Sequence, residues 1–296
     1  MYGRADEKEL LLLMKHLMIS VYCVGQNDYE LLLKILESVR DENIGVELAM
    51  HTHFSAVKPH FLPELAPWKE KLSPYYRTFH GPFREIDATS PAGTEAHRIV
   101  TEGFEEAFAF YNDFHGNSMV MHTNQDFDQN ADRNTLRANV HDTICEVAEA
   151  AARRGVHLCV ENVGVPSEGN VLFDEDQYIS LINSLPASVG SLIDTGHAFL
   201  QNWDMERLIR TLGTRIEGYH INNNNGIADS HRPVFEPGCF YNDDDWRRLF
   251  TLMEKYSPDA EWILEYAPGP HMSAELMEKE IRGVLAMVRS ISAENT

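Results

Sequence analysis

Short runs of aliphatic, aromatic and β-branched residues recur along this chain, separated by stretches with apolar residues three or four positions apart. The runs predict buried strands, and the stretches between them predict amphipathic helices. The predicted strands span residues 17–22, 45–49, 77–80, 118–122, 157–161, 191–194, 216–221 and 262–265. The predicted helices span residues 29–39, 95–114, 136–153, 175–183, 205–212, 246–256 and 274–290. Asp28 and Asp204 stand where N-caps belong, and Gly155 stands where a helix stops.

Eight strands that alternate with helices favour right-handed β-α-β units and a parallel sheet that closes on itself. We therefore predict an α/β fold, a single (β/α)8 TIM barrel. No linker or shift in composition divides the chain, so residues 1–296 are predicted to form one domain, with a short helical extension over about residues 5–15. The long loops 51–76 and 222–246 both follow predicted strands, where a barrel carries its active face.

Composition narrows the classes of function. Hydrophobic residues make up 43% of the 296 positions, which excludes a disordered chain. The formal net charge of -21 argues against a nucleic acid or an anionic membrane as partner. The apolar run 10–14 is too short to cross a membrane, and the four scattered cysteines form no C-x-x-C pair. A cytoplasmic protein is the resulting prediction.

Several apolar runs in the second half of the chain end in a side chain that binds metals. The residues at these ends are Glu161, Asp194, His220, Asp229 with His231, and Glu265. In a barrel the carboxyl ends of all strands meet at one face, so these groups would converge there. Clustered carboxylates and imidazoles are costly to bury unless a cation holds them. The sequence therefore predicts a divalent-metal site at the mouth of the barrel.

Other residues extend this set. His80 ends the third predicted strand, His122 ends the fourth, and Glu47 lies near the end of the second as a candidate supporting residue. His197 follows Asp194 after a Thr-Gly turn. As alternatives to metal binding, His197 could be a hydrogen-bonded core histidine and Asp194 could be a helix N-cap.

Asp229 and His231 are two residues apart, so an extended segment would turn both side chains to one side. Arg232 is a candidate anchor for a substrate hydroxyl or phosphate, against the alternative of a surface charge. His51 and His53 form a His-x-His pair in a loop that the pattern does not place.

This series of strand ends resembles the xylose isomerase-like TIM-barrel superfamily, which also contains the endonuclease IV-like enzymes (AP endonuclease family 2). The motifs that carry the resemblance are Glu161-Asn162, Asp194-Thr-Gly-His197, His220, Asp229-x-His231 and Glu265. Within this superfamily, the chain most resembles members of the sugar phosphate isomerase/epimerase type. It implies one divalent metal held by Glu161, Asp194, His220 and Glu265, with the two glutamates as catalytic acid and base.

The endonuclease IV-like members of the same superfamily hold three zinc ions with a larger set of ligands. The matching residues here are His80, His122, His197, Asp229 and His231. Against a DNA repair enzyme stand the charge of -21 and the loop Arg-Pro-Val-Phe-Glu-Pro-Gly at residues 232–238. The glycine-rich stretch expected after Asn162 is present only as Gly164 and Gly169.

Three functions follow as hypotheses. The leading one is an isomerase or epimerase that acts on a small sugar or sugar phosphate through an enediolate, with His197 and Arg232 binding the substrate. It would use zinc, manganese, cobalt or magnesium, one to three ions per chain. The alternatives are a multinuclear zinc hydrolase that cleaves a phosphoester, and a barrel that only binds a ligand. A homo-oligomer is a further expectation from the resemblance.

Overall fold

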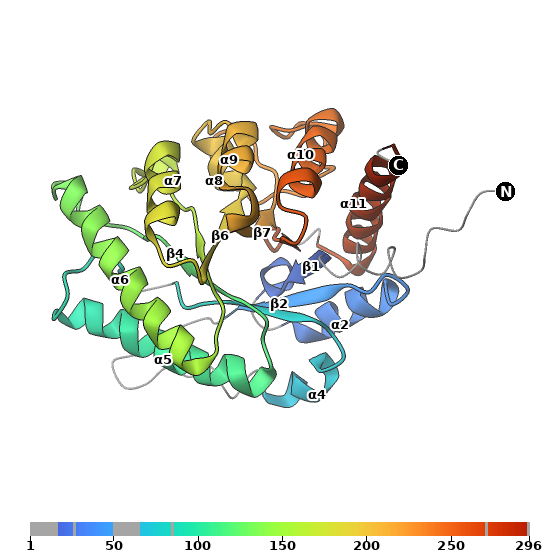
Figure 1. The fold of residues 1–296 in the computed structure, drawn as a ribbon. Coiled ribbons are helices and arrows are strands. Elements are labelled where there is room, and N and C mark those ends of the chain that lie inside the picture. Colours follow the sequence, from blue (N-terminus) through green and yellow to red (C-terminus); the bar gives the residue numbers. More distant parts are fainter. Residues whose placement is uncertain (1–16, 26–27, 50–65, 84–85, 270–271, 295–296) are drawn as a thin grey trace.

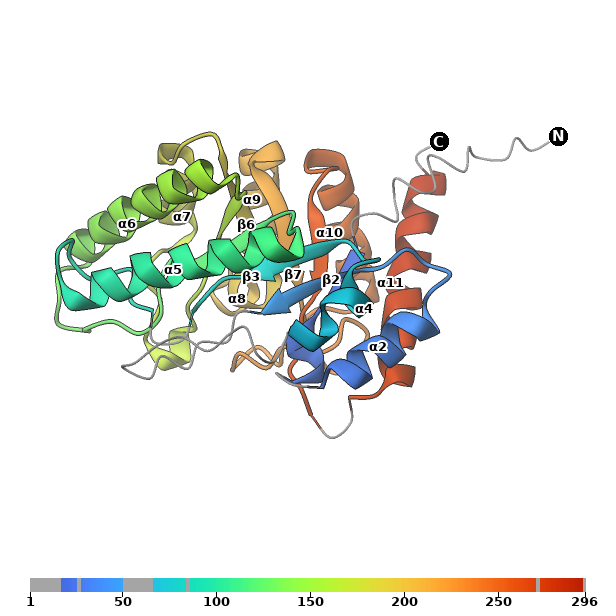
Figure 2. The ribbon, with the colours of Figure 1, turned by 90° about the horizontal axis from the view of Figure 1, so that it is seen from below.

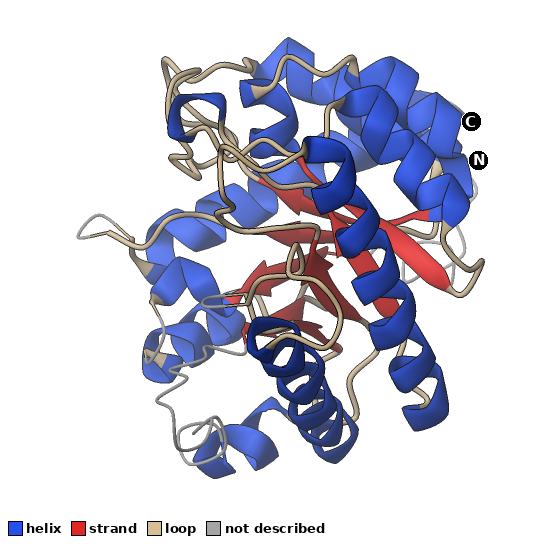
Figure 3. Cartoon of the chain, turned by 90° about the vertical axis from the view of Figure 1, so that its left-hand side faces the viewer, coloured by secondary structure: helices blue, strands red, loops and turns tan. Residues whose placement is uncertain are grey.

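The chain closes eight parallel strands into a barrel with helices around it, as the hydrophobic pattern predicts (Figures 1 and 3). This computed structural model describes residues 17–25, 28–49, 66–83, 86–269 and 272–294. The strands are β1 Leu17–Ser20, β2 Gly45–Ala49, β3 Arg77–His80, β4 Met119–His122, β5 Leu158–Glu161, β6 Val189–Asp194, β7 Ile216–Ile221 and β8 Glu261–Leu264. Each strand pairs with its neighbours in sequence, and β1 pairs with β8 to close the barrel.

The helices lie outside the strands and bury an apolar face against them. They are α2 Tyr29–Ser38, α4 Lys69–Leu72, α5 Glu95–Phe114, α6 Arg133–Arg154, α7 Glu175–Ser184, α8 Thr195–Leu200, α9 Met205–Leu212, α10 Asp243–Tyr256 and α11 Ala274–Glu294. Helix α5 lies beside α6 (Figure 2), and α11 packs against α2 where the barrel closes. None of the helices in the described residues is both long enough and apolar enough to cross a membrane.

Local signals set the helix ends as predicted. The Asp28 carboxylate accepts from the amide of Leu31 at 2.9 Å, and the Asp204 carboxylate accepts from the amide of Arg207 at 3.1 Å. Gly155 ends α6 with a φ of 69°, a left-handed conformation that glycine adopts at low cost. These caps fix where α2 and α9 begin and where α6 ends.

The structure corrects some predicted boundaries. Strand β1 ends at Ser20, where the chain enters a 3-10 helix over Val21–Val24, so the prediction of strand to residue 22 is wrong. The turn predicted after Asp194 is instead the start of the short helix α8. The predicted extension over residues 5–15, together with His51 and His53, lies outside the described residues.

Candidate metal centre

The predicted site residues meet at the carboxyl ends of the strands. A cavity of about 200 Å³ opens there, and its lining includes the aromatic residues Tyr22 and Phe83. The predicted residues that line it are His80, His122, Glu161, His197, Asp229, His231 and Glu265. Asp194 and His220 lie deeper and are fully buried. All nine predicted metal ligands therefore lie in or directly beneath one cavity.

Four of these residues form the centre of the cluster. One ligand atom from each of Glu161, Asp194, His220 and Glu265 lies within 4.8 Å of the others. The Nδ1 atom of His220 is 3.2 Å from Oε1 of Glu161 and 3.1 Å from Oε2 of Glu265. The two glutamates thus face one imidazole nitrogen from strands β5 and β8. This is the set that the resemblance implies for a single metal ion.

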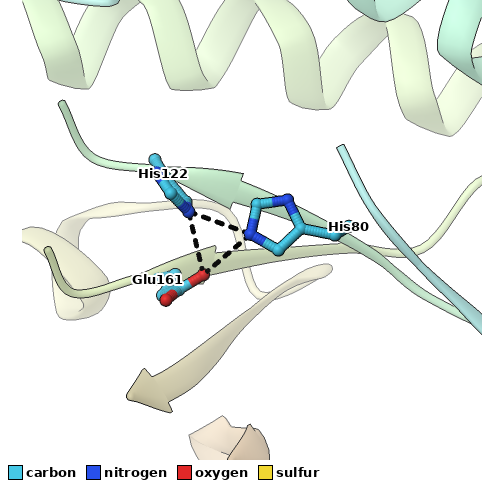
Figure 4. A group of neighbouring side chains, drawn as sticks. All are labelled: His80, His122 and Glu161. Carbon is cyan, nitrogen blue, oxygen red and sulfur yellow. Dashed lines mark hydrogen bonds and ion pairs between the residues drawn. The ribbon is translucent and has the colours of Figure 1, made fainter. Parts of the chain in front are cut away.

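A second group lies beside the first and shares Glu161 with it (Figure 4). The Nε2 atoms of His80 and His122 are 3.0 Å apart. Oε2 of Glu161 is 3.6 Å from the first of these nitrogens and 3.2 Å from the second. The two imidazoles and the carboxylate point at one another from the ends of β3, β4 and β5.

A third group joins His197 of α8 to two residues of the loop after β7. Oδ2 of Asp229 is 3.3 Å from Nε2 of His197, and Oδ1 of Asp229 is 3.0 Å from Nδ1 of His231. Nε2 of His231 in turn is 3.5 Å from Oε2 of Glu265 and 3.7 Å from Oδ2 of Asp194. Asp229 therefore lies between the two histidines, and His231 connects it to the central four residues.

The side chain of Asn222 and the backbone amide of His197 hold the Asp194 carboxylate in place. The Asn222 amide donates to Oδ2 of Asp194 at 2.7 Å, and the amide of His197 donates to Oδ1 at 2.6 Å. Gly196 makes this arrangement possible, because a Cβ there would lie 2.0 Å from Oδ1 of Asn222. The sequence analysis missed Asn222, although it opens a run of four asparagines directly after the seventh strand.

Glu47 supports His220 from beneath. Oε2 of Glu47 is 3.1 Å from Nε2 of His220, and neither side chain is exposed to solvent. If the imidazole donates Nε2–H to this carboxylate, its Nδ1 lone pair faces Glu161 and Glu265. The side-chain amide nitrogen of Gln125, which sequence reasoning missed, donates to Nδ1 of His122.

The carboxylates and imidazoles of the cluster shift one another's pKa values. Burial would raise the pKa of Glu161, but His220 and His122 lower it well below its usual range. Burial would also raise the pKa of Glu265, and His220 and His231 lower it to about 2. The pKa of His197 moves in the opposite sense, since Asp194 and Asp229 outweigh burial and raise it to about 10. These carboxylates and imidazoles thus stabilise one another's charged forms.

These residues fit a divalent metal ion. Glu161 Oε2, His220 Nδ1 and Asp229 Oδ1 are buried and lie beside ion-pair partners, but within the described part of the chain none of the three makes a hydrogen bond of suitable geometry. Buried polar atoms without partners are costly, and a cation would satisfy all three. Carboxylate oxygens and imidazole nitrogens are the donors that zinc, manganese and cobalt accept.

Arg232, a predicted substrate-binding residue, lies apart from this cluster. Its guanidinium pairs with the carboxylate of Glu236, and its backbone bonds to Asn223 at the base of the loop. It is not among the described residues that line the cavity. His197, the other predicted substrate-binding residue, does line the cavity.

Comparisons with known proteins agree with this geometry. The model of the xylose isomerase-like TIM-barrel family matches residues 44–284. The chain belongs to this family. No curated protein matches the sequence.

Solved structures share the barrel. D-psicose 3-epimerase with D-tagatose from Clostridium cellulolyticum H10 superposes with a TM-score of 0.69 at 14% identity, over 93% of this chain and 99% of that one. An IOLI protein with a binding zinc atom gives a TM-score of 0.69 at 16% identity, over 94% and 98%. AP endonuclease family 2 from Brucella melitensis gives 0.64 at 14% identity, over 86% and 93%. At these identities the likeness shows the xylose isomerase-like fold.

Proposed function

We propose that this xylose isomerase-like barrel is a divalent-metal-dependent isomerase or epimerase of a small sugar or sugar phosphate. Its metal would be held by Glu161, Asp194, His220 and Glu265. The observation that carries the proposal is that Glu161 and Glu265 approach the same nitrogen of His220, at 3.2 and 3.1 Å. Solved relatives of this fold include a D-psicose 3-epimerase and an L-ribulose 3-epimerase.

The two glutamates would exchange a proton with the carbon next to the substrate carbonyl. They reach the cavity from β5 and β8 and could address opposite faces of a bound ketose. The low pKa of Glu265, about 2, keeps its carboxylate ionised at neutral pH. A bound divalent ion would polarise the carbonyl and hydroxyl oxygens and favour the enediolate. His197 would orient a hydroxyl, and Tyr22 and Phe83 would cover the apolar face of the sugar.

The test is turnover of ketoses and their phosphates by the metal-loaded protein. We expect Glu265→Gln to fold normally and to lose at least about 100-fold in kcat, because it removes one acid–base group. Glu102→Gln, an exposed glutamate on α5, is the matched control. Full activity in Glu265→Gln would contradict the mechanism. A metal-loaded wild type that turns over none of these ketoses or ketose phosphates would contradict the proposed function.

The His80–His122–Glu161 group favours one alternative, a multinuclear zinc hydrolase that cleaves a phosphoester. The two Nε2 atoms, 3.0 Å apart, face the same carboxylate oxygen, as ligands of an additional ion would. Asp229 and His231 would complete the larger set. We expect two or three zinc ions per chain if this is the function, and fewer in His80→Ala and His122→Ala. Unchanged metal content in both variants would rule the hydrolase out.

A further inference from the structure

A second cluster of metal-type side chains lies at the opposite end of the barrel. His157 directly precedes β5, Cys159 lies within it, and Glu217 lies at the start of β7. One ligand atom from each lies within 4.8 Å of the other two. All three line a cavity of about 310 Å³ at the amino-terminal ends of the strands. This cavity shares no lining residue with the one at the carboxyl ends.

An irregularity in β7 brings Glu217 into this cluster. Ser191 pairs with Ile216, but the next residue of β6, Leu192, pairs with Gly218. Glu217 is therefore the extra residue of a bulge, a feature that redirects a side chain. Alternation back from His220 would otherwise place Glu217 on the outer face of the strand.

Gly190 leaves the space that the Glu217 carboxylate occupies. A Cβ at Gly190 would lie 2.7 Å from Cδ of Glu217 and 3.0 Å from Sγ of Cys159. The carboxylate and the thiol thus approach each other across a position on β6 that has no side chain. The bulge and the glycine act together to bring the two groups to one point.

The charge around the cluster is negative. Glu217, Asp259 and Glu261 line the cavity, and no lysine or arginine does so among the described residues. The buried Cys159 thiol has no hydrogen-bond partner among the described residues either. A thiol, an imidazole and a carboxylate form a donor set that suits zinc, whereas magnesium and calcium prefer oxygen donors alone.

We propose that His157, Cys159 and Glu217 form a second metal site, for zinc or a similar thiophilic divalent ion, which ties β5 to β7 at the amino-terminal end of the barrel. Water or the nearby Glu261 would complete the coordination. In the absence of metal, His157 and Glu217 bond to each other. The ion would displace the proton between them and the thiol proton of Cys159. The proposal is independent of the reaction at the other end of the barrel.

Cobalt(II) added to the chelator-treated full chain tests the proposal. The nine candidate ligands at the carboxyl ends offer only nitrogen and oxygen, so a thiolate-to-cobalt charge-transfer band would report a cysteine ligand. We expect the band in the wild type, its loss in Cys159→Ala, and its displacement by zinc. Cys23→Ala is the matched control, because Cys23 is equally buried but bonds to the backbone of Leu264 and Tyr266. It should keep the band.

Two results with the wild type and Cys159→Ala would overturn the proposal. One is a folded wild type that gives no band at saturating cobalt while its carboxyl-end site fills. The other is a band that survives in Cys159→Ala. If that variant does not fold, Glu217→Gln serves instead and should weaken cobalt binding at least tenfold. An unchanged band in Glu217→Gln would also contradict the assignment.

Discussion

Strand β8 begins with one glutamate and is followed directly by another, and the two differ in their surroundings. At the start of the strand, burial raises the pKa of Glu261, and its carboxylate accepts from the hydroxyls of Tyr76 and Ser118. Just past the other end, His220 and His231 overcome burial and hold the pKa of Glu265 at about 2. The same residue type favours protonation where burial dominates, even against two hydroxyl donors, and ionisation where imidazoles outweigh burial. The neighbours of a strand-end carboxylate, more than its position, decide its chemistry.

The largest expected effect comes from a methyl group placed between Asp194 and Asn222. In Gly196→Ala the new Cβ would collide with Oδ1 of Asn222, and the amide that holds Asp194 would have to move. We expect a loss of about 1–3 kcal/mol in stability from overpacking and about 10–100-fold in metal affinity at the carboxyl end. Thermal unfolding and metal titration measure the two effects.

Gly190→Ala, near the amino-terminal end of β6, is the matched change at the other end of the barrel. Its Cβ would displace Glu217 and leave Asp194 untouched. Metal binding at the carboxyl end should then stay as in the wild type, while the cobalt–thiolate band is lost. Equal loss of metal at both ends in either variant would show that the two clusters do not act separately.

Glu47 gives the next largest effect. Removal of its carboxylate in Glu47→Ala leaves Nε2 of His220 without its buried partner. We expect about 10–100-fold weaker metal binding, as for other residues that orient a metal-ligating histidine. Glu47→Gln should lose less, because an amide oxygen can still accept from the imidazole. A titration in which both variants bind metal like the wild type would exclude a positioning role for Glu47.

Much of this arrangement was predictable from sequence. The alternation of side chains along a strand is a local property, and a barrel brings the carboxyl ends of all its strands to one face. Apolar runs that stop at Glu161, Asp194 and His220 place those side chains at one face of the barrel whatever the details of the helices. The barrel itself follows from eight such runs and is confirmed by the closed sheet. The metal roles of these residues stay predictions.

The rest depends on contacts between distant segments. The bulge at Glu217 shifts the alternation by one residue, so the pattern of β7 alone gives the wrong side for that carboxylate. Asn222 reaches Asp194 across 28 positions, and nothing in either segment signals the partner. The Thr-Gly-His sequence at residues 195–197 is typical of a turn, but Asp194 caps it and the helix α8 forms.

A smaller effect is expected from pH in the metal-free protein. The pKa of His197 is raised from 6.5 to about 10, so its contribution to stability is complete below pH 6.5 and disappears as pH rises through 10. His197→Gln should therefore cost about 1–2 kcal/mol at pH 6 and progressively less toward pH 10. His141→Gln, on the exposed side of α6, is the control. A cost of His197→Gln that is constant with pH would contradict the raised pKa.

The smallest expected effect concerns Glu261, the other glutamate of β8. Burial raises its pKa above 4.5, so the protein loses stability as pH rises through the raised value and the carboxyl ionises. Glu261→Gln keeps an acceptor for Tyr76 and Ser118 but cannot ionise. In the presence of chelator we expect it to match the wild type at low pH and to be more stable at pH 7, by less than about 1 kcal/mol. Chemical denaturation at several pH values measures the difference. A variant that is less stable than the wild type at pH 7 would mean that the ionised carboxylate is stabilised there, and that the two ends of β8 differ less than their neighbours imply.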